Sequence, residues 1–241
     1  MDIEETLDAN MQALSENPYP GRGIVIGMTP DGSRLVQLYW IMGRSQNSRN
    51  RVFVREDGTV RTQAFDESKV EDPSLIIYNC IRSFPRCHVV SNGDQTDTIF
   101  EAMRAGRTFE QALMTRTFEP DAPNYTPRIA GVVNLNDTFH AYQLGILKAV
   151  AGSGEHCTRH FFSYETAVPG AGHCVTTYET DGSPLPSFRG EPHLLPLGDD
   201  LEELAGRYWD ALDEDNKVAL AAKSIDPETD ATEIVIINKH A

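Results

Sequence analysis

Short apolar runs separated by turn residues dominate this chain. Residues 22–28 and 34–42 predict two strands joined by the turn TPDGS, and residues 52–56 and 59–65 predict a hairpin with Asp57-Gly58 at its tip. Further strands are expected at residues 75–81, 87–92, 128–135, 139–147, 157–165, 173–179 and 232–239. Because hairpin signals rather than helices join most of these strands, the sheets should be mainly antiparallel.

Helical spacing of apolar residues marks the remaining elements. Residues 2–16 predict a short amphipathic helix that ends at the following prolines. Residues 96–115 predict a helix broken near Gly106, with Thr96 as its N-cap, and residues 201–222 predict a second helical block. Two antiparallel sheets with helices packed outside them is the layering that these elements favour.

The sequence shows no feature that would divide the chain into several domains. No internal repeat and no long linker divides it, which predicts a single domain over residues 1–241 with residues 1–18 as an N-terminal helical extension. The most linker-like stretch, residues 180–200, is rich in Pro and Gly. A loop of about 20 residues is long enough to suggest a function.

Composition narrows the class of protein. Hydrophobic residues make up 40% of the chain, no apolar run reaches the length of a membrane helix, and the acidic N-terminus lacks the apolar region of a secretory signal. The four cysteines show no CxxC spacing, so we expect reduced, mostly buried thiols in a cytoplasmic protein. A net charge of −15 opposes binding to nucleic acid or to an anionic membrane.

One segment runs against this acidic composition. The stretch GRSQNSRNR, residues 43–51, contains Arg44, Arg49 and Arg51 and no acid. Like charges repel, so such a cluster needs an anionic partner or enough water to screen it. Arginine forks bind phosphate well, which makes this loop a candidate site for a small phosphorylated ligand.

Three other polar segments interrupt apolar strands: YNCIR (78–82), SNGDQTDT (91–98) and EPDAPNYTPR (119–128). Taken singly, each has an ordinary structural explanation, because Asn-Gly marks a turn and prolines stiffen loops. In this order and at these separations, however, GRS…NR, YNCIR, VVSNGDQTDTI and NYTPRIA resemble the archaeal-type inosine monophosphate (IMP) cyclohydrolase family. The resemblance covers roughly residues 19–135 and thins out afterwards.

The resemblance implies a fold and an activity. The family is similar in fold to the N-terminal nucleophile hydrolases, an α+β four-layer α-β-β-α sandwich of mainly antiparallel sheets. Its reaction, hydrolase chemistry on a cyclic amidine, closes the ring of 5-formamidoimidazole-4-carboxamide ribotide to IMP with loss of water in purine biosynthesis. The implied partner is therefore a small purine ribotide, no metal or other cofactor is needed, and a homo-oligomer is left open.

The resemblance also implies candidate site residues, whose roles follow from the needs of the family's reaction. Tyr78 resembles a family active-site tyrosine suited to passing a proton to the leaving oxygen, and Glu119 resembles a family glutamate that could accept the amide proton. Either Arg49 or Arg51 could match the family's arginine, because the loop here is about two residues longer than in the family. The candidate substrate-binding residues are Arg22, Arg44, Ser45, Asn79, Asn92, Gly93, Asp94, Asn124, Thr126 and Arg128.

Four other classes of protein compete with an IMP cyclohydrolase-like enzyme. A true N-terminal nucleophile hydrolase needs a Ser, Thr or Cys at the start of its first strand. Here Tyr19 stands at that place, which disfavours this class. GRGIVIG lacks the preceding strand of a dinucleotide site, and His156 and His160 lie in strand-like sequence rather than in a metal-binding helix. A non-catalytic purine-nucleotide-binding protein of the same fold stays open, since it would need the arginines but not Tyr78 or Glu119.

Overall fold

Two antiparallel sheets form the framework of the computed structural model, which describes residues 2–70, 73 and 76–240. The strands of the first sheet are β1 (Gly23–Met28), β2 (Leu35–Met42), β10 (Ala171–Thr176), β11 (His193–Pro196), β12 (Lys217–Ile225) and β13 (Thr232–Asn238), in the order β11-β10-β1-β2-β12-β13. The strands of the second are β3 (Arg51–Glu56), β4 (Thr59–Ala64), β5 (Asn79–Phe84), β6 (Cys87–Ser91), β7 (Arg128–Asn134), β8 (Tyr142–Val150) and β9 (Ser153–Tyr164), in sequence order.

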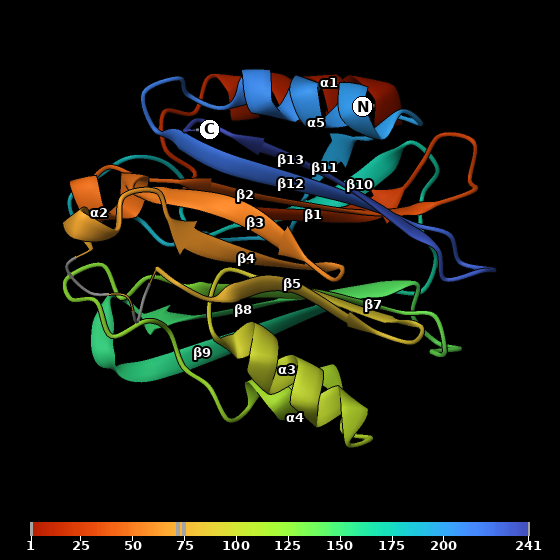
Figure 1. Cartoon of the computed structure of the whole chain (residues 1–241), viewed down its shortest axis with the longest axis horizontal. Helices are drawn as coiled ribbons and strands as arrows, with labels where there is room; N and C mark the ends of the chain where they lie inside the picture. Colours follow the sequence, from red (N-terminus) through yellow and green to blue (C-terminus); the bar gives the residue numbers. More distant parts are fainter. Residues whose placement is uncertain (1, 71–72, 74–75, 241) are drawn as a thin grey trace.

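Helices cover both outer faces of this pair of sheets. The helices are α1 (Ile3–Ser15), α2 (Gln46–Arg49), α3 (Gln95–Arg104), α4 (Phe109–Leu113) and α5 (Leu201–Ala211), with a 3-10 turn at Glu67–Lys69. Figure 1 shows α1 and α5 above the first sheet and α3 and α4 below the second, so the layers follow the order helix, sheet, sheet, helix. The expected α+β architecture with mainly antiparallel sheets is confirmed.

Three apolar cores lie between these layers. The central core fills the space between the two sheets and includes Ile26, Tyr39 and Ile146. A second core packs α1 and α5 on the first sheet, and a third packs α3 and α4 on the second. Both faces of the central strands are therefore buried, and all eight residues of β2 are inaccessible.

Several predicted elements are confirmed. The N-terminal helix spans Ile3–Ser15 and packs through Leu14 against the first sheet and α5. The helical segment after residue 95 is broken at Gly106, whose φ of +77° suits glycine. The predicted N-cap is wrong, however: Asp94 holds that position, and the Thr96 hydroxyl is bonded to the Gly93 carbonyl and to Ser91.

The prediction of helix over residues 213–222 is wrong. Helix α5 ends at Ala211, and the Ala-rich segment that follows is strand β12, in which every residue is buried. Burial on both faces removes the alternation that would identify a strand, so the sequence resembles a buried helix. The linker-like stretch 180–200 likewise contains the short strand β11.

Several other boundaries differ from the prediction, among them those of β8, β9 and β10. The strand expected at 75–81 begins at Asn79 and continues to Phe84, and residues 74 and 75 lie outside the described part of the chain. The arginine-rich loop contains one turn of helix, α2, because Ser45 caps it by accepting a hydrogen bond from the Ser48 backbone N–H at 3.1 Å. This turn directs successive arginines of the loop in different directions.

Candidate functional site

A cavity of about 210 Å³ lies at the end of the sandwich where β2 finishes and β3 begins. Six of the residues predicted from sequence line it: Arg22, Arg44, Ser45, Arg51, Asn124 and Thr126. They come from segments far apart in the sequence, and both sheets contribute. Two of the four predicted polar segments, residues 43–51 and 119–128, therefore meet at this cavity, whereas residues 78–82 and 91–98 do not line it.

Arg51 is the most unusual residue of this cavity. It is the first residue of β3, its side chain is completely buried, and its Nε donates to the Ser48 carbonyl at 2.8 Å. Neither Nη1 nor Nη2 has a hydrogen-bond partner among the described residues, and burial lowers the pKa of the guanidinium. A buried cation with unused donors is costly unless something binds it, so this geometry points to an anionic or strongly accepting ligand group.

Arg22 and Glu119 form an ion pair beside Arg51. Arg22 Nη1 lies 3.6 Å from Glu119 Oε2, and the Glu119 side chain is only 3% exposed. Burial raises the pKa of Glu119, although Arg22, Arg128 and Arg51 pull it down. Burial also opposes the charge on Arg22, but the groups around it, Glu119 first, raise its pKa above the ordinary value. A carboxylate with a raised pKa is suited to accept a proton near neutral pH.

Tyr78 lies next to these charges in the segment that leads into β5. Its backbone exchanges hydrogen bonds with Thr62 of β4, and its hydroxyl lies 2.7 Å from the hydroxyl of Tyr39 in the facing sheet. Burial raises the pKa of Tyr78, while Arg51 and Arg22 act in the opposite direction. The phenol therefore stays protonated near neutrality and can donate a proton. Arg51 acts on the pKa of Tyr78, so the two side chains lie near each other, but Tyr78 is not among the residues that line the cavity. A pocket shared by the two stays a prediction.

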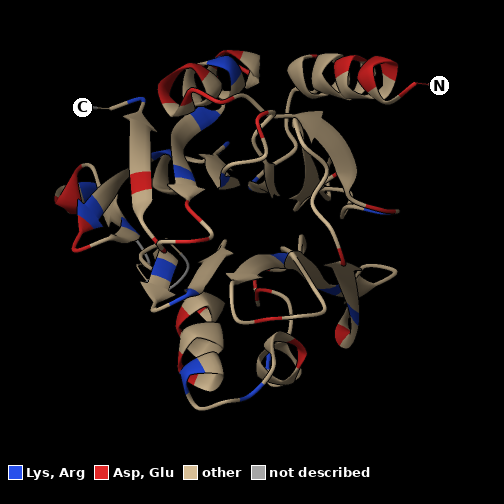
Figure 2. Ribbon diagram, turned by 90° about the vertical axis from the view of Figure 1, so that its right-hand side faces the viewer, with Lys and Arg blue, Asp and Glu red and all other residues tan. Residues whose placement is uncertain are grey.

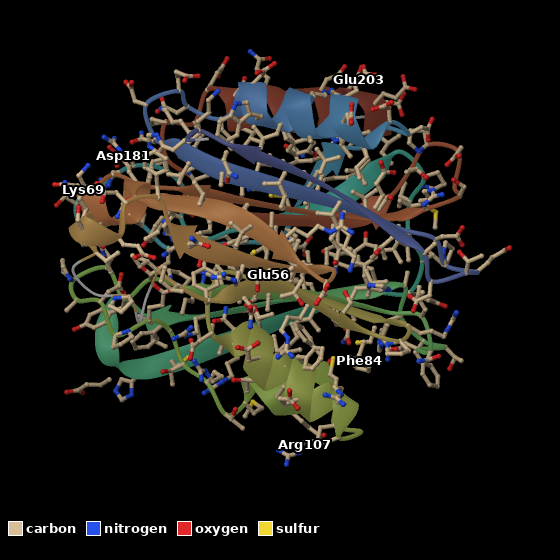
Figure 3. The ribbon with its side chains drawn as sticks, in the orientation of Figure 1. Glu56, Lys69, Phe84, Arg107, Asp181 and Glu203 are labelled. Carbon is tan, nitrogen blue, oxygen red and sulfur yellow. The ribbon has the colours of Figure 1, made fainter. Side chains whose placement is uncertain are left out.

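The rim of the cavity is formed by the arginine loop and by a segment near residue 180. Arg44 pairs with Asp181, donates to the Gly182 carbonyl at 3.0 Å and lies over the Tyr19 ring. Figure 3 labels Asp181 at the same end of the molecule as α2. Ser45 and Ser48 complete this side of the cavity. Arg44 is thus half-exposed at the entrance, whereas Arg51 lies at the bottom.

Arg49 does not reach the cavity. Its Nε donates to the Gly43 carbonyl at 2.8 Å and its Nη2 donates to Asn216 Oδ1 at 3.0 Å. The guanidinium fastens the arginine loop to the segment before β12. Between the two arginines that the sequence left open, only Arg51 lines the cavity.

A second group of predicted residues forms a polar junction behind the cavity. The Asn92 Oδ1 accepts from the Ile129 backbone N–H, and Arg128 Nη1 donates to Asp94 Oδ1 and Gln95 Oε1. A Cβ on Gly93 would lie 2.6 Å from Gln95 Oε1 and 2.7 Å from Arg128 Nη1, so a larger residue would displace these side-chain ends. The junction connects the turn before α3 to β7, and Arg128 also acts on the pKa of Glu119.

Asn79 and Asn124 complete the set. Asn79 Nδ2 donates to Asp97 of α3 at 3.0 Å, away from the cavity lining. Asn124 Oδ1 accepts from the Leu185 backbone N–H at 3.2 Å and lies in the cavity wall. Of these two, only Asn124 is placed to touch a ligand directly.

Several residues of the site were not predicted from the sequence, including Tyr39, Tyr178 and Asp121. Tyr39 contacts Tyr78, Tyr178 lines the cavity with its hydroxyl 2.6 Å from Thr126 Oγ1, and Asp121 accepts from the Thr126 backbone N–H at 2.6 Å. Tyr39 and Tyr178 lie within or directly after apolar strands, where tyrosine is an ordinary core residue. Asp121 lies in a segment already singled out, and its spacing from Thr126 was the available signal.

The fold and the cavity define a class: an α+β sandwich with an arginine-lined cavity at one open end of its central layer. A family model described as IMP cyclohydrolase-like protein matches residues 19–230. The chain belongs to this family, as the sequence motifs had indicated.

Curated relatives agree with the family match. The chain is 36% identical over 133 residues to IMP cyclohydrolase of Methanocella arvoryzae, covering 54% of this chain and 62% of the relative. It is 31% identical over 125 residues to IMP cyclohydrolase of Methanocaldococcus jannaschii, covering 52% and 61%. The match with IMP cyclohydrolase of Methanosphaera stadtmanae, 31% over 166 residues, covers 67% and 74%. The first two matches thus span less than two thirds of the relatives' length.

None of the described helices is long and apolar enough to cross a membrane. All four cysteines are free thiols, and Cys80, Cys87 and Cys174 are buried, as expected from the sequence. Burial raises the pKa of Cys80, which packs in the central core. Its thiolate is therefore strongly disfavoured near neutrality.

Proposed function

We propose that this protein is an IMP cyclohydrolase, which closes the imidazole-bound formamide of a ribotide onto the neighbouring carboxamide and releases water. The observation that carries the proposal is Arg51, a buried guanidinium with both terminal nitrogens unpartnered, beside Tyr78 and the Arg22–Glu119 pair. The family membership and the names of the relatives support the same reaction.

The rim of the cavity is suited to the ribotide phosphate. Arg44 is half-exposed there, and the hydroxyls of Ser45 and Ser48 are close by. A phosphate that enters would replace Asp181 as the partner of Arg44, which exchanges one charge-assisted contact for another. The base would then lie deeper, toward Arg51 and Tyr78.

The reaction needs little beyond positioning and proton transfer, because both reacting groups belong to one molecule. The carboxamide nitrogen attacks the formyl carbon and passes a proton to Glu119. The formyl oxygen becomes an oxyanion that Arg51 stabilises with its two free Nη groups. Tyr78 donates a proton to this oxygen, and its phenol is held by the contact with Tyr39. Protonated Glu119 supplies the second proton, so the oxygen leaves as water while the ring C=N bond forms. The proton released from the former formamide nitrogen then restores Tyr78.

The remaining predicted residues receive secondary roles in this proposal. Arg51 rather than Arg49 is the catalytic arginine, because only Arg51 reaches the cavity. Asn124 and Thr126 orient the substrate directly. The residues Asn79, Asn92, Gly93, Asp94 and Arg128 act indirectly, by fixing the junction that places Arg128 near Glu119.

The proposal extends to the architecture. The helix–sheet–sheet–helix layering supports a likeness to the N-terminal nucleophile hydrolases, with residues 1–241 as one domain and residues 1–18 as an extension that packs on the first sheet. The free thiols fit a cytoplasmic location. No described element before Tyr19 lines the cavity, which favours a site that works without a processed N-terminal nucleophile.

The test is incubation of the purified protein with 5-formamidoimidazole-4-carboxamide ribotide, followed by chromatography for IMP. The expected result is turnover without any added metal, nucleotide or redox cofactor. Tight binding of the ribotide and of IMP without turnover would instead identify a non-catalytic purine-nucleotide-binding protein. The positions of Tyr78 and Glu119 beside the unpartnered arginine favour catalysis.

A further inference from the structure

A second polar cluster lies at the opposite open end of the central layer. Lys223 of β12 and His88 of β6 are buried, with relative exposures of 1% and 2%, and they meet Ser83 of β5 and Asp230 of the β12–β13 turn. This turn projects from the right-hand end of the molecule in Figure 1, the end that faces the viewer in Figure 2. None of these four residues lines the cavity described above.

The contacts in this cluster form a continuous chain. Lys223 Nζ lies 2.5 Å from Ser83 Oγ and 2.9 Å from His88 Nδ1. His88 Nε2 lies 2.8 Å from Asp230 Oδ1, and His88 Nδ1 lies 3.2 Å from Ser83 Oγ. A carboxylate only accepts, so Asp230 fixes the proton of His88 on Nε2 and leaves Nδ1 as an acceptor.

The position of the proton on His88 also determines the direction of the hydrogen bonds that Lys223 makes. His88 Nδ1 accepts a hydrogen from the Lys223 nitrogen, which is consistent with a neutral amine whose lone pair faces Ser83. In the charged amine Nζ donates to Ser83 Oγ. Once Lys223 loses its proton, this direction reverses and the Ser83 hydroxyl donates to the freed lone pair. The result is a serine whose proton points at an unprotonated amine, the arrangement that activates a hydroxyl nucleophile.

We propose that Ser83 is a nucleophile that accepts acyl groups from small activated acyl esters, with Lys223 as the base that takes its proton. The Ser83 oxygen attacks the ester carbonyl carbon, and its proton passes to Lys223 Nζ. The carbon–oxygen bond to the leaving alcohol or phenol breaks, and Lys223 returns the proton to that leaving group. Ser83 is left as an acyl ester, which water can later cleave.

Accessibility and protonation agree with this role. Ser83 is partly exposed, whereas Lys223 behind it is buried. Burial lowers the pKa of Lys223 to about 7; Asp230 and Cys87 act against this shift, and Arg55 acts with it. His88 stays neutral over the same range, because burial and Lys223 lower its pKa to about 4. The neutral amine therefore becomes the major form only above about pH 7.

If this cluster served only to stabilise the fold, we would expect its buried hydrogen-bonding groups to have partners. Gln37 pairs with Lys223 across β2 and β12 and donates to the His88 carbonyl at 3.1 Å. Its Oε1 is buried and has no partner among the described side chains and backbone groups. Buried acceptors are normally satisfied, so the hydrogen-bonding capacity of this end is not exhausted by the fold.

The test uses p-nitrophenyl acetate as the acyl donor and peptide mass spectrometry as the readout. We expect acetylation at Ser83 in the wild-type chain, with a rate that rises through about pH 7 as Lys223 loses its proton. Ser33, which donates to an aspartate rather than to an amine, is the internal control and should stay unmodified. Absence of acetylation at Ser83 between about pH 6 and 9 would overturn the proposal.

Two variants separate a nucleophile from a structural serine. Ser83→Ala should abolish acetylation of the peptide that contains residue 83, and Lys223→Met should slow acetylation of Ser83 by about a hundredfold and remove its pH dependence. Circular dichroism and ribotide turnover verify that each variant is folded, since neither residue belongs to the proposed ribotide site. Equal acetylation of Ser83 in Lys223→Met and wild type would show that the amine is not the base.

Discussion

The two open ends of the central layer bury charge in opposite ways. At one end, Arg51 has two unpartnered nitrogens and Arg22 has a single acidic neighbour at 3.6 Å. At the other end, Lys223, His88 and Asp230 are joined by short contacts, and burial brings the amine close to neutrality. The charged donors of the first end lack partners, whereas the ionisable groups of the second end contact one another.

This difference separates two ways of tolerating a buried ionisable group. An arginine cannot lose its proton in a protein, so Arg51 stays charged. Only a bound hydrogen-bond acceptor offsets the free-energy cost of burying this charge. A lysine can shed its proton, so Lys223 avoids the cost by becoming neutral. The choice of arginine at one end and lysine at the other therefore matches a binding site and a proton-transfer site, respectively.

The strongest test of the comparison replaces Arg51 with Met. Loss of the two free donors should lower kcat/KM for the formamido ribotide by about 10²–10³-fold. The unliganded variant should nevertheless be more stable than wild type, by about 1 kcal/mol or more, because a buried unpaired charge is gone. Steady-state kinetics and urea unfolding measure the two effects. A variant that is both active and less stable would mean that Arg51 is a structural residue.

Tyr78→Phe should affect turnover rather than binding. Removal of the phenolic proton should lower kcat by roughly a hundredfold with little change in KM, because the hydroxyl acts mainly in the transition state. Tyr39→Phe is the matched control, since it removes the neighbouring hydroxyl and keeps the proposed donor. A higher KM with unchanged kcat in Tyr78→Phe would assign the tyrosine to ground-state binding instead.

Lys223→Met should change how stability depends on pH. The wild-type fold holds a lysine whose pKa is about 7, while the unfolded chain keeps the proton up to about pH 10.4. Between these values the unfolded state binds more protons, so stability rises with pH by up to about 1.4 kcal/mol per unit. Urea unfolding at several pH values from 7 to about 8.5 should show this slope in wild type and its loss in the variant. Parallel curves would place the amine outside the buried cluster.

Arg49→Ala should produce the smallest effect. The variant loses the hydrogen bonds to Gly43 and Asn216, which should cost about 1–2 kcal/mol of stability. Its kcat and KM should stay close to wild type, since the side chain does not line the cavity. A loss of activity comparable to that of Arg51→Met would show that the two arginines have been assigned the wrong way round.

Local signals in the sequence were enough to predict much of this structure. The hairpin at Asp57-Gly58, the helix at 3–15 and the break at Gly106 each depend on nearby residues, and each was predicted. Strand β12 was missed because burial of both faces hides its period, and the surrounding sheet decides its conformation. Long-range packing, rather than local preference, sets that element.

The candidate site also combines residues that local motifs indicated with residues that only long-range packing brings together. Arg51 was a candidate because of the cluster of arginines in an acidic chain, whereas Tyr78 and Glu119 were candidates because their motifs resemble those of the family. The sequence could not choose between Arg49 and Arg51, since the choice depends on how one turn of helix α2 orients the loop. Tyr39 and Asp181 take part through contacts with residues 39 and 137 positions away, respectively, which no local pattern reveals.

The placement of Arg22 on the first sheet and Arg51 on the second has a consequence for the motions of the protein. A ribotide bound between them would join the two sheets at the end where each is open to solvent. At a concentration about 100 times its Kd, such a ligand stabilises the fold by about 2.7 kcal/mol. Amide hydrogen exchange should therefore slow first at the start of β1 and β3, and only weakly near the β12–β13 turn.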